Sequence, residues 1–122
     1  MSPSARRPFL VLFLASASFG CGDSADPVAA EPCSVTAPTE CLEPDLRYAD
    51  VAPIFEQHCA ECHTGVGAEP WPLDSYENVA DWADLVRDEL VRCSMPPADS
   101  SHPLANPERT RILNWLRCGL TE

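Results

Sequence analysis

The chain has 122 residues and a formal net charge of −11, enough for one small domain with attached segments. All 19 acidic residues follow Cys21, and the chain contains no lysine. Nucleic acid and anionic membrane surfaces are therefore poor partners for such an acidic surface. A redox protein with a basic docking face would suit the charge, and solubility alone explains it equally well.

Residues 1–20 have the pattern of an export signal. Arg6 and Arg7 provide a positively charged start, an apolar run covers residues 8–19, and small residues lead to Cys21. The apolar run is too short for a transmembrane helix. Cys21 lies where bacterial lipoproteins carry their lipidated cysteine, so we expect export to the periplasmic side of the cell envelope and a lipid anchor at Cys21. An ordinary cleaved signal is the alternative.

Residues 21–45 are predicted to form a lipidated, acidic tether. The stretch is rich in proline, alanine, serine and acids and has almost no large apolar residue. It offers too little apolar surface to offset the entropy lost on ordering. Cys33 and Cys41 either close a small loop within this tether or pair with the domain that follows.

Residues 46–122 are predicted to form an all-α domain, because apolar residues recur at helical spacing and no strand-like alternation occurs. A first helix near 48–58 runs directly into Cys59, and Asp74 is expected to cap a short turn after a loop. Further helices are predicted over about 82–92 and 107–118, the last capped by Asn106 and ended by Gly119. The expected buried positions are Tyr48, Val51, Ile54 and Phe55; Trp82, Leu85, Val86 and Leu90; Ile112, Trp115 and Leu116.

The string Cys59-Ala60-Glu61-Cys62-His63 has the pattern of a covalent attachment site for c-type haem. Two thiols on one turn can reach the two vinyl groups of one porphyrin, and His63 can then give its Nε2 to the iron. The loop of residues 64–73 is expected to present a backbone carbonyl to Nδ1 of His63 and so fix its tautomer. Trp71 and Leu73 would cover the ring, or Trp71 would fill the core. His58 is expected to be an exposed helix-end residue.

Met95 is the predicted second axial ligand of the iron. It is the only methionine that remains after the signal is removed, and it lies on a proline-stiffened loop between two helices. A thioether is a soft, neutral ligand that favours Fe(II) and raises the reduction potential. His102 is the alternative distal ligand and would give bis-histidine ligation at a lower potential.

This interpretation assigns a role to each of the seven cysteines and leaves none as a free thiol. Cys21 carries lipid, Cys59 and Cys62 carry haem, and four cysteines remain for two disulfides in an oxidising compartment: Cys33, Cys41, Cys93 and Cys118. One expected bond joins Cys93 to Cys118 and ties the Met95 loop to the end of the last helix.

In order along the chain, these motifs resemble small monohaem cytochromes c, in particular the cytochrome c-like domains of bacterial envelope proteins. The resemblance covers residues 46–120 and includes Cys-x-x-Cys-His, Leu-x-Ser-Tyr-x-x-Val, Met-Pro-Pro and Trp-Leu-x-Cys-Gly. It implies the class I cytochrome c fold, with three to four short helices around one covalent haem c and the first and last helices crossing near Phe55 and Trp115. The lack of lysine departs from the family's usual basic docking face.

The predicted function is one-electron transfer, without any catalysed reaction on a substrate. A five-coordinate haem sensor or peroxidase-like subunit is one alternative, and it would bind exogenous CO readily. A non-haem module is another, in which Cys59 and Cys62 form a dithiol redox pair or join His63 and Cys93 at zinc. Thiol oxidoreductases place such a pair after a strand, a setting that this sequence lacks.

Overall fold

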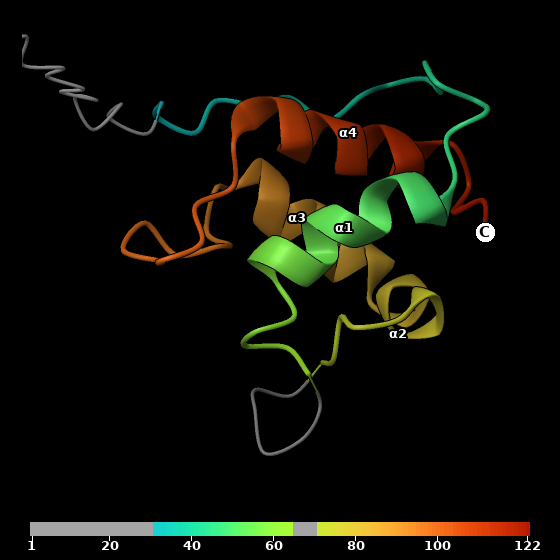
Figure 1. The fold of residues 1–122 in the computed structure, drawn as a ribbon. Coiled ribbons are helices and arrows are strands. Elements are labelled where there is room, and N and C mark those ends of the chain that lie inside the picture. The colour runs from blue at the N-terminus through green and yellow to red at the C-terminus, as the bar shows by residue number, and fades with distance from the viewer. Residues whose placement is uncertain (1–30, 65–70) are drawn as a thin grey trace, which may run out of the picture.

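Four helices form the regular structure of this chain in a computed structural model that describes residues 31–64 and 71–122 (Figure 1). They are α1 (Tyr48–His58), α2 (Tyr76–Asp81), α3 (Ala83–Val91) and α4 (Asn106–Arg117). No strand occurs within these ranges, which confirms the predicted all-α class. In the same ranges, every helix is too short or too polar to cross a membrane. The predicted signal of residues 1–20, Cys21 and the first part of the tether lie outside the described residues.

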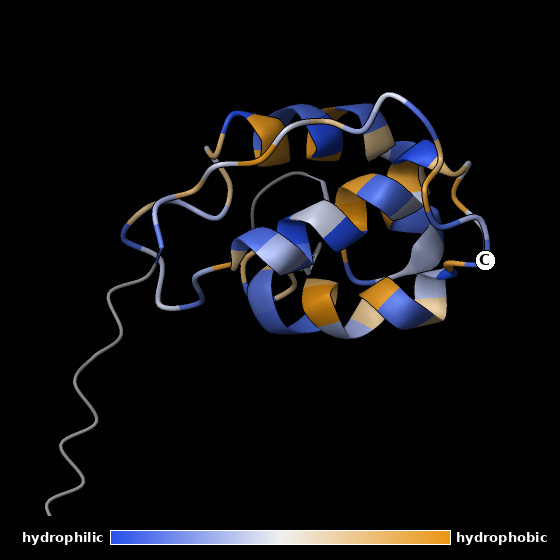
Figure 2. Ribbon diagram, turned by 90° about the horizontal axis from the view of Figure 1, so that it is seen from above, coloured by the Kyte–Doolittle hydropathy of each residue, from blue (hydrophilic) through white to orange (hydrophobic). Residues whose placement is uncertain are grey.

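The core lies where α1 and α3 pack against α4, and Figure 2 shows residues of high hydropathy, in orange, on these helices. Trp115 of α4 is fully buried, and its ring centroid lies 6.3 Å from that of Phe55 in α1, as expected for the crossing of these two helices. Its indole N–H donates to the carbonyl of Thr121 at 2.8 Å, so burial leaves no unpaired donor. The buried apolar residues are Leu46, Val51, Phe55, Leu73, Val79, Leu90, Leu104, Ile112, Leu113 and Trp115. Leu85, expected to be buried, is instead 45% exposed.

Two predicted helix caps are wrong by one residue. Ser75, rather than Asp74, caps α2, where its hydroxyl accepts a hydrogen bond from the backbone N–H of Asn78 at 3.3 Å. Helix α4 begins at Asn106, so Ala105 is the capping position, and the Glu108 carboxylate accepts from the Ala105 N–H at 3.0 Å. The Asn106 side chain is instead engaged by residues 31–45, a partner that local capping patterns do not include.

Residues 31–45, which we call the strap, lie along α4 rather than apart from the helices (Figure 1). At the start of α4, Asn106 accepts from the N–H of Ser34 at 3.0 Å and donates to the carbonyl of Pro32 at 3.1 Å. At the other end, Arg117 donates to the carbonyl of Thr39 at 3.1 and 2.6 Å. The backbone of this stretch, expected to be part of a tether, is therefore held by polar contacts that do not depend on apolar surface.

Two disulfides fix the strap, and they correct the expected pairing. Cys33 bonds to Cys93 and Cys41 bonds to Cys118, so neither a local Cys33–Cys41 loop nor a Cys93–Cys118 bond forms. Cys93 joins the strap near the start of α4, whereas Cys118 directly follows its last residue. A helix of 12 residues is about 18 Å long, far beyond the Cα separation of about 4.4–6.8 Å that a disulfide spans. Cys93 and Cys118 consequently each need a partner from the strap.

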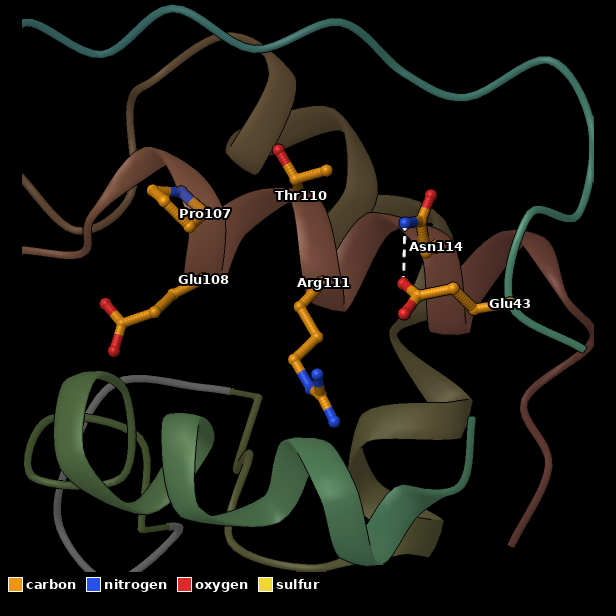
Figure 3. Close-up of a pocket in the computed structure, with 6 residues that line it drawn as sticks. All are labelled: Glu43, Pro107, Glu108, Thr110, Arg111 and Asn114. Atoms are coloured by element: carbon orange, nitrogen blue, oxygen red, sulfur yellow. Dashed lines mark hydrogen bonds between the residues drawn. The ribbon is translucent and has the colours of Figure 1, made fainter. Parts of the chain in front are cut away.

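An open groove of about 320 Å³ is lined by residues of α4 and by Glu43 of the strap (Figure 3). In the close-up, Glu108 and Arg111 extend from α4 toward α1, while Asn114 donates to the Glu43 carboxylate of the strap at 2.8 Å. The groove is lined by Glu43, Pro107, Glu108, Thr110, Arg111 and Asn114. None of the predicted haem-binding residues is among them.

Candidate haem-attachment site

The end of α1 folds the predicted attachment motif into a tight turn. The N–H of Cys59 donates to the carbonyl of Phe55 at 2.9 Å, which continues the helical pattern as far as the first thiol. The N–H groups of Cys62 and His63 then both donate to the carbonyl of Cys59, at 3.2 and 3.0 Å. The two thiols and the imidazole are therefore held on one short stretch of ordered backbone.

Cys59 and Cys62 are the two cysteines of the described residues that carry free thiols. Burial raises the pKa of the Cys59 thiol to about 11, an effect that the charge of Arg109 opposes only in part. Cys62 is exposed. A redox-active thiol pair uses a thiolate with a lowered pKa, so the environment of Cys59 is the reverse of what dithiol chemistry requires.

His63 is oriented by the loop that returns after it. Its Nδ1 lies 3.1 Å from the carbonyl oxygen of Trp71, in the geometry of an N–H that donates to this oxygen. The N–H of Leu73 donates back to the carbonyl of His63 at 2.7 Å. With Nδ1 engaged, Nε2 is the ring nitrogen left for a metal, which is the tautomer expected from the sequence. Residues 65–70 of this loop lie outside the described residues.

Trp71 holds an unusual conformation at this point. Its φ angle is +80°, in the left-handed region that a bulky residue rarely adopts. The side chain is 46% exposed and its ring centroid lies 5.8 Å from that of Trp82. The expectation that Trp71 fills the core is wrong, whereas Leu73 is buried within it.

We expect Trp71→Gly to be more stable than Trp71→Ala by about 1 kcal/mol. Inside a helix the alanine variant is ordinarily the more stable of the two. Both variants lose the indole, but only glycine takes a φ of +80° without strain. Urea denaturation of the two variants, compared with the same pair of substitutions at exposed Leu85 in α3, measures the difference. Equal stability of the Trp71 variants would contradict the assigned backbone conformation.

The loop that carries Met95 and His102 lies beside the attachment motif. His102 forms an ion pair with Glu61, which lies between the two thiols in sequence, and its backbone carbonyl is 3.4 Å from Nδ1 of His58. Met95 is 41% exposed, and its carbonyl accepts a hydrogen bond of 2.6 Å from the guanidinium of Arg109. Arg109 is also close enough to Cys59 to influence its pKa. These contacts bring both candidate distal ligands to the side of the domain that holds Cys59.

Two residues of this region were missed or misplaced by sequence reasoning. His58 is not an exposed helix end: its side chain is only 7% exposed, and its Nε2 lies 3.5 Å from the Glu108 carboxylate. Arg109 is 4% exposed and belongs to the buried face of α4. Its position three residues before Ile112 and four before Leu113 places it on their face, and this spacing is the signal that could have identified it.

The residues present fit a covalently bound haem c. Two thiols are unpaired in a structure whose other described cysteines form disulfides, and His63 has one ring nitrogen engaged and one left as a donor. The large apolar side chains exposed in residues 31–64 and 71–122 are Leu42, Trp71, Leu85 and Met95. Two of these four, Trp71 and Met95, lie on the loops that flank the motif, and an apolar macrocycle would cover such a surface.

The zinc alternative lacks one of its expected ligands. The Cys93 sulfur is bonded to Cys33 and is not a thiolate. Across residues 31–64 and 71–122, no group of three or more His, Cys, Asp or Glu side chains is arranged to hold a metal ion. Comparison of the chain with known protein families, curated proteins and solved structures found no match.

Proposed function

We propose that this protein is a one-electron carrier of the cytochrome c type, with a single haem c bonded to Cys59 and Cys62. His63 would be the proximal ligand through Nε2, and Met95 the distal ligand through its sulfur. When bound, the haem supplies an iron that changes between Fe(II) and Fe(III) without breaking a bond of any substrate. The fold would be a small class I cytochrome c fold.

The hydrogen bond between Nδ1 of His63 and the carbonyl of Trp71 is the observation that carries this proposal. An engaged Nδ1–H fixes the imidazole orientation and makes Nε2 a better donor. This arrangement, directly after two unpaired thiols, is the one that a proximal haem ligand requires. Trp71, whose carbonyl forms this contact, has a strained φ angle, and backbone strain of this kind is typical of functional sites.

Met95 is favoured over His102 by the contacts of the two side chains. Nε2 of His102 is engaged by the Glu61 carboxylate, and ligation by His102 would have to break that ion pair. Met95 is held through its backbone carbonyl, which leaves its thioether without a competing partner. A thioether bound there would close the distal side, so exclusion of CO from the reduced protein distinguishes this proposal from a five-coordinate sensor or peroxidase-like subunit.

Export and a basic partner complete the proposal. Two disulfides support an oxidising compartment, and the predicted lipid at Cys21 would confine the carrier to the periplasmic side of an envelope membrane. Without lysine, the mature chain has six arginines and 19 acidic residues, a net charge of −13. The rate of electron transfer to a basic redox protein should fall as ionic strength rises.

Reversible redox titration tests the proposal. The protein is produced with haem-maturation machinery. Its absorption spectrum is then recorded as a function of the potential, which an electrode sets through redox mediators. We expect a single one-electron transition for the wild type and no covalent haem in Cys59→Ala/Cys62→Ala. Cys62→Ala alone should leave at most one thioether bond. A wild-type protein without a redox-active chromophore, or one that turns over peroxide faster than it exchanges electrons, would refute the assignment.

A further inference from the structure

Arg109 is a buried cation without an acidic partner among the described residues. Its side chain lies inside the domain, and its Nε is fully buried and makes no hydrogen bond. By contrast, Arg87, Arg92 and Arg111 form ion pairs at the surface. Removing a guanidinium from water costs free energy that a neutral residue of the same size would avoid.

Within the described residues, the one side-chain hydrogen bond of Arg109 reaches the loop that carries the candidate distal ligand. Nη1 donates to the carbonyl of Met95 at 2.6 Å, across 14 positions of sequence. A charge-assisted bond of this length is among the strong ones in proteins. The donor projects from α4, which is packed against α1 and α3 in the core. The loop is therefore attached to the buried face of α4 at the residue that would bind the iron.

We propose that Arg109 is the positioning residue for Met95: its buried guanidinium holds the Met95 loop from α4 and keeps a positive charge beside the haem site. This inference rests on the proposed function for the identity of the ligand. The charge lies at the Met95 backbone, and it is close enough to Cys59, the first attachment thiol, to act on the pKa of that thiol. A fixed positive charge there opposes the extra positive charge of Fe(III) and so raises the reduction potential.

The test compares Arg109→Met with Arg111→Met in the matured protein. Arg111 lies on the same helix, but it is exposed and pairs with Asp50 at 3.9 Å, so its variant controls for the loss of an α4 charge. In Arg109→Met we expect a weakened near-infrared Met–Fe band, a lower reduction potential, and affinity for added imidazole raised by about tenfold or more. In Arg111→Met all three should match the wild type. Arg109→Lys, which keeps the charge, should restore most of the potential.

A second readout does not depend on haem. Amide hydrogen exchange across residues 94–100 is measured in the haem-free wild type and in both variants. Exchange that accelerates in Arg109→Met but not in Arg111→Met supports the positioning role even if no haem is found, an outcome that would refute only the proposed function. Unchanged exchange, or a Met–Fe band and potential equal to the wild type, would overturn the inference. If Arg109→Met does not fold, Arg109→Gln serves in the same comparison.

Discussion

In the matured protein, Met95→Ala is expected to abolish the near-infrared Met–Fe band and to let CO bind the reduced form readily. The substitution removes the one thioether of the described residues, and an alanine methyl group gives the iron no replacement. The reduction potential should also fall, because the soft ligand that favours Fe(II) is lost. Absorption spectra of the oxidised protein, CO titration of the reduced protein and a potentiometric titration measure the three effects.

His102→Ala is the matched control for Met95→Ala, because both residues lie on the loop that follows α3. It should lose the ion pair with Glu61 while keeping the Met–Fe band and excluding CO. The opposite result, an unchanged spectrum in Met95→Ala and a changed one in His102→Ala, would assign the distal position to His102 and predict a lower potential for the wild type.

The second large effect concerns the disulfides. The double variant Cys41→Ser/Cys118→Ser should lose about 4 kcal/mol of unfolding free energy, because the bond closes a loop over a sequence separation of 77 residues. A domain of this size has a total stability on the order of 5–10 kcal/mol, so this loss is a large fraction of it. Guanidinium denaturation of the matched forms, with and without the bond, measures the difference.

Cys33→Ser/Cys93→Ser removes the other bond, and we expect it to affect both the stability of the fold and the ligation of the iron by Met95. The sequence separation is 60 residues, so the entropic loss should be similar, about 4 kcal/mol. Cys93 lies two residues before Met95, and its own φ of +58° is strained, so this variant should also weaken the Met–Fe band. A Cys41→Ser/Cys118→Ser protein with full wild-type stability would show that the bond between strap and α4 end contributes nothing to the stability of the fold.

The local part of the site could be predicted from sequence because it depends on neighbours in the chain. The two glycines and two prolines that follow His63 in sequence predict a loop that presents a carbonyl to its ring, and the structure confirms a contact of Nδ1 with the carbonyl of Trp71. The packing of the first and last helices at Phe55 and Trp115, which the resemblance to small cytochromes c implied, is also present in the structure.

The remaining features depend on partners that are distant in sequence. Polar hydrogen bonds and two cross-links hold the strap along α4, and composition indicates only that its apolar surface is small. The burial of His58 follows from Glu108 and His102, which come from α4 and the loop before it. Arg109 was overlooked because arginine is ordinarily exposed, although its spacing places it on the apolar face.

Intact-mass spectrometry of the denatured mature protein is the most direct test of the central claim. A thioether-bonded haem survives denaturation, so the wild type made under maturation-competent conditions should carry the mass of one haem, and Cys59→Ala/Cys62→Ala should carry none. A wild type with the bare polypeptide mass, two intact disulfides and two alkylatable thiols would contradict the account.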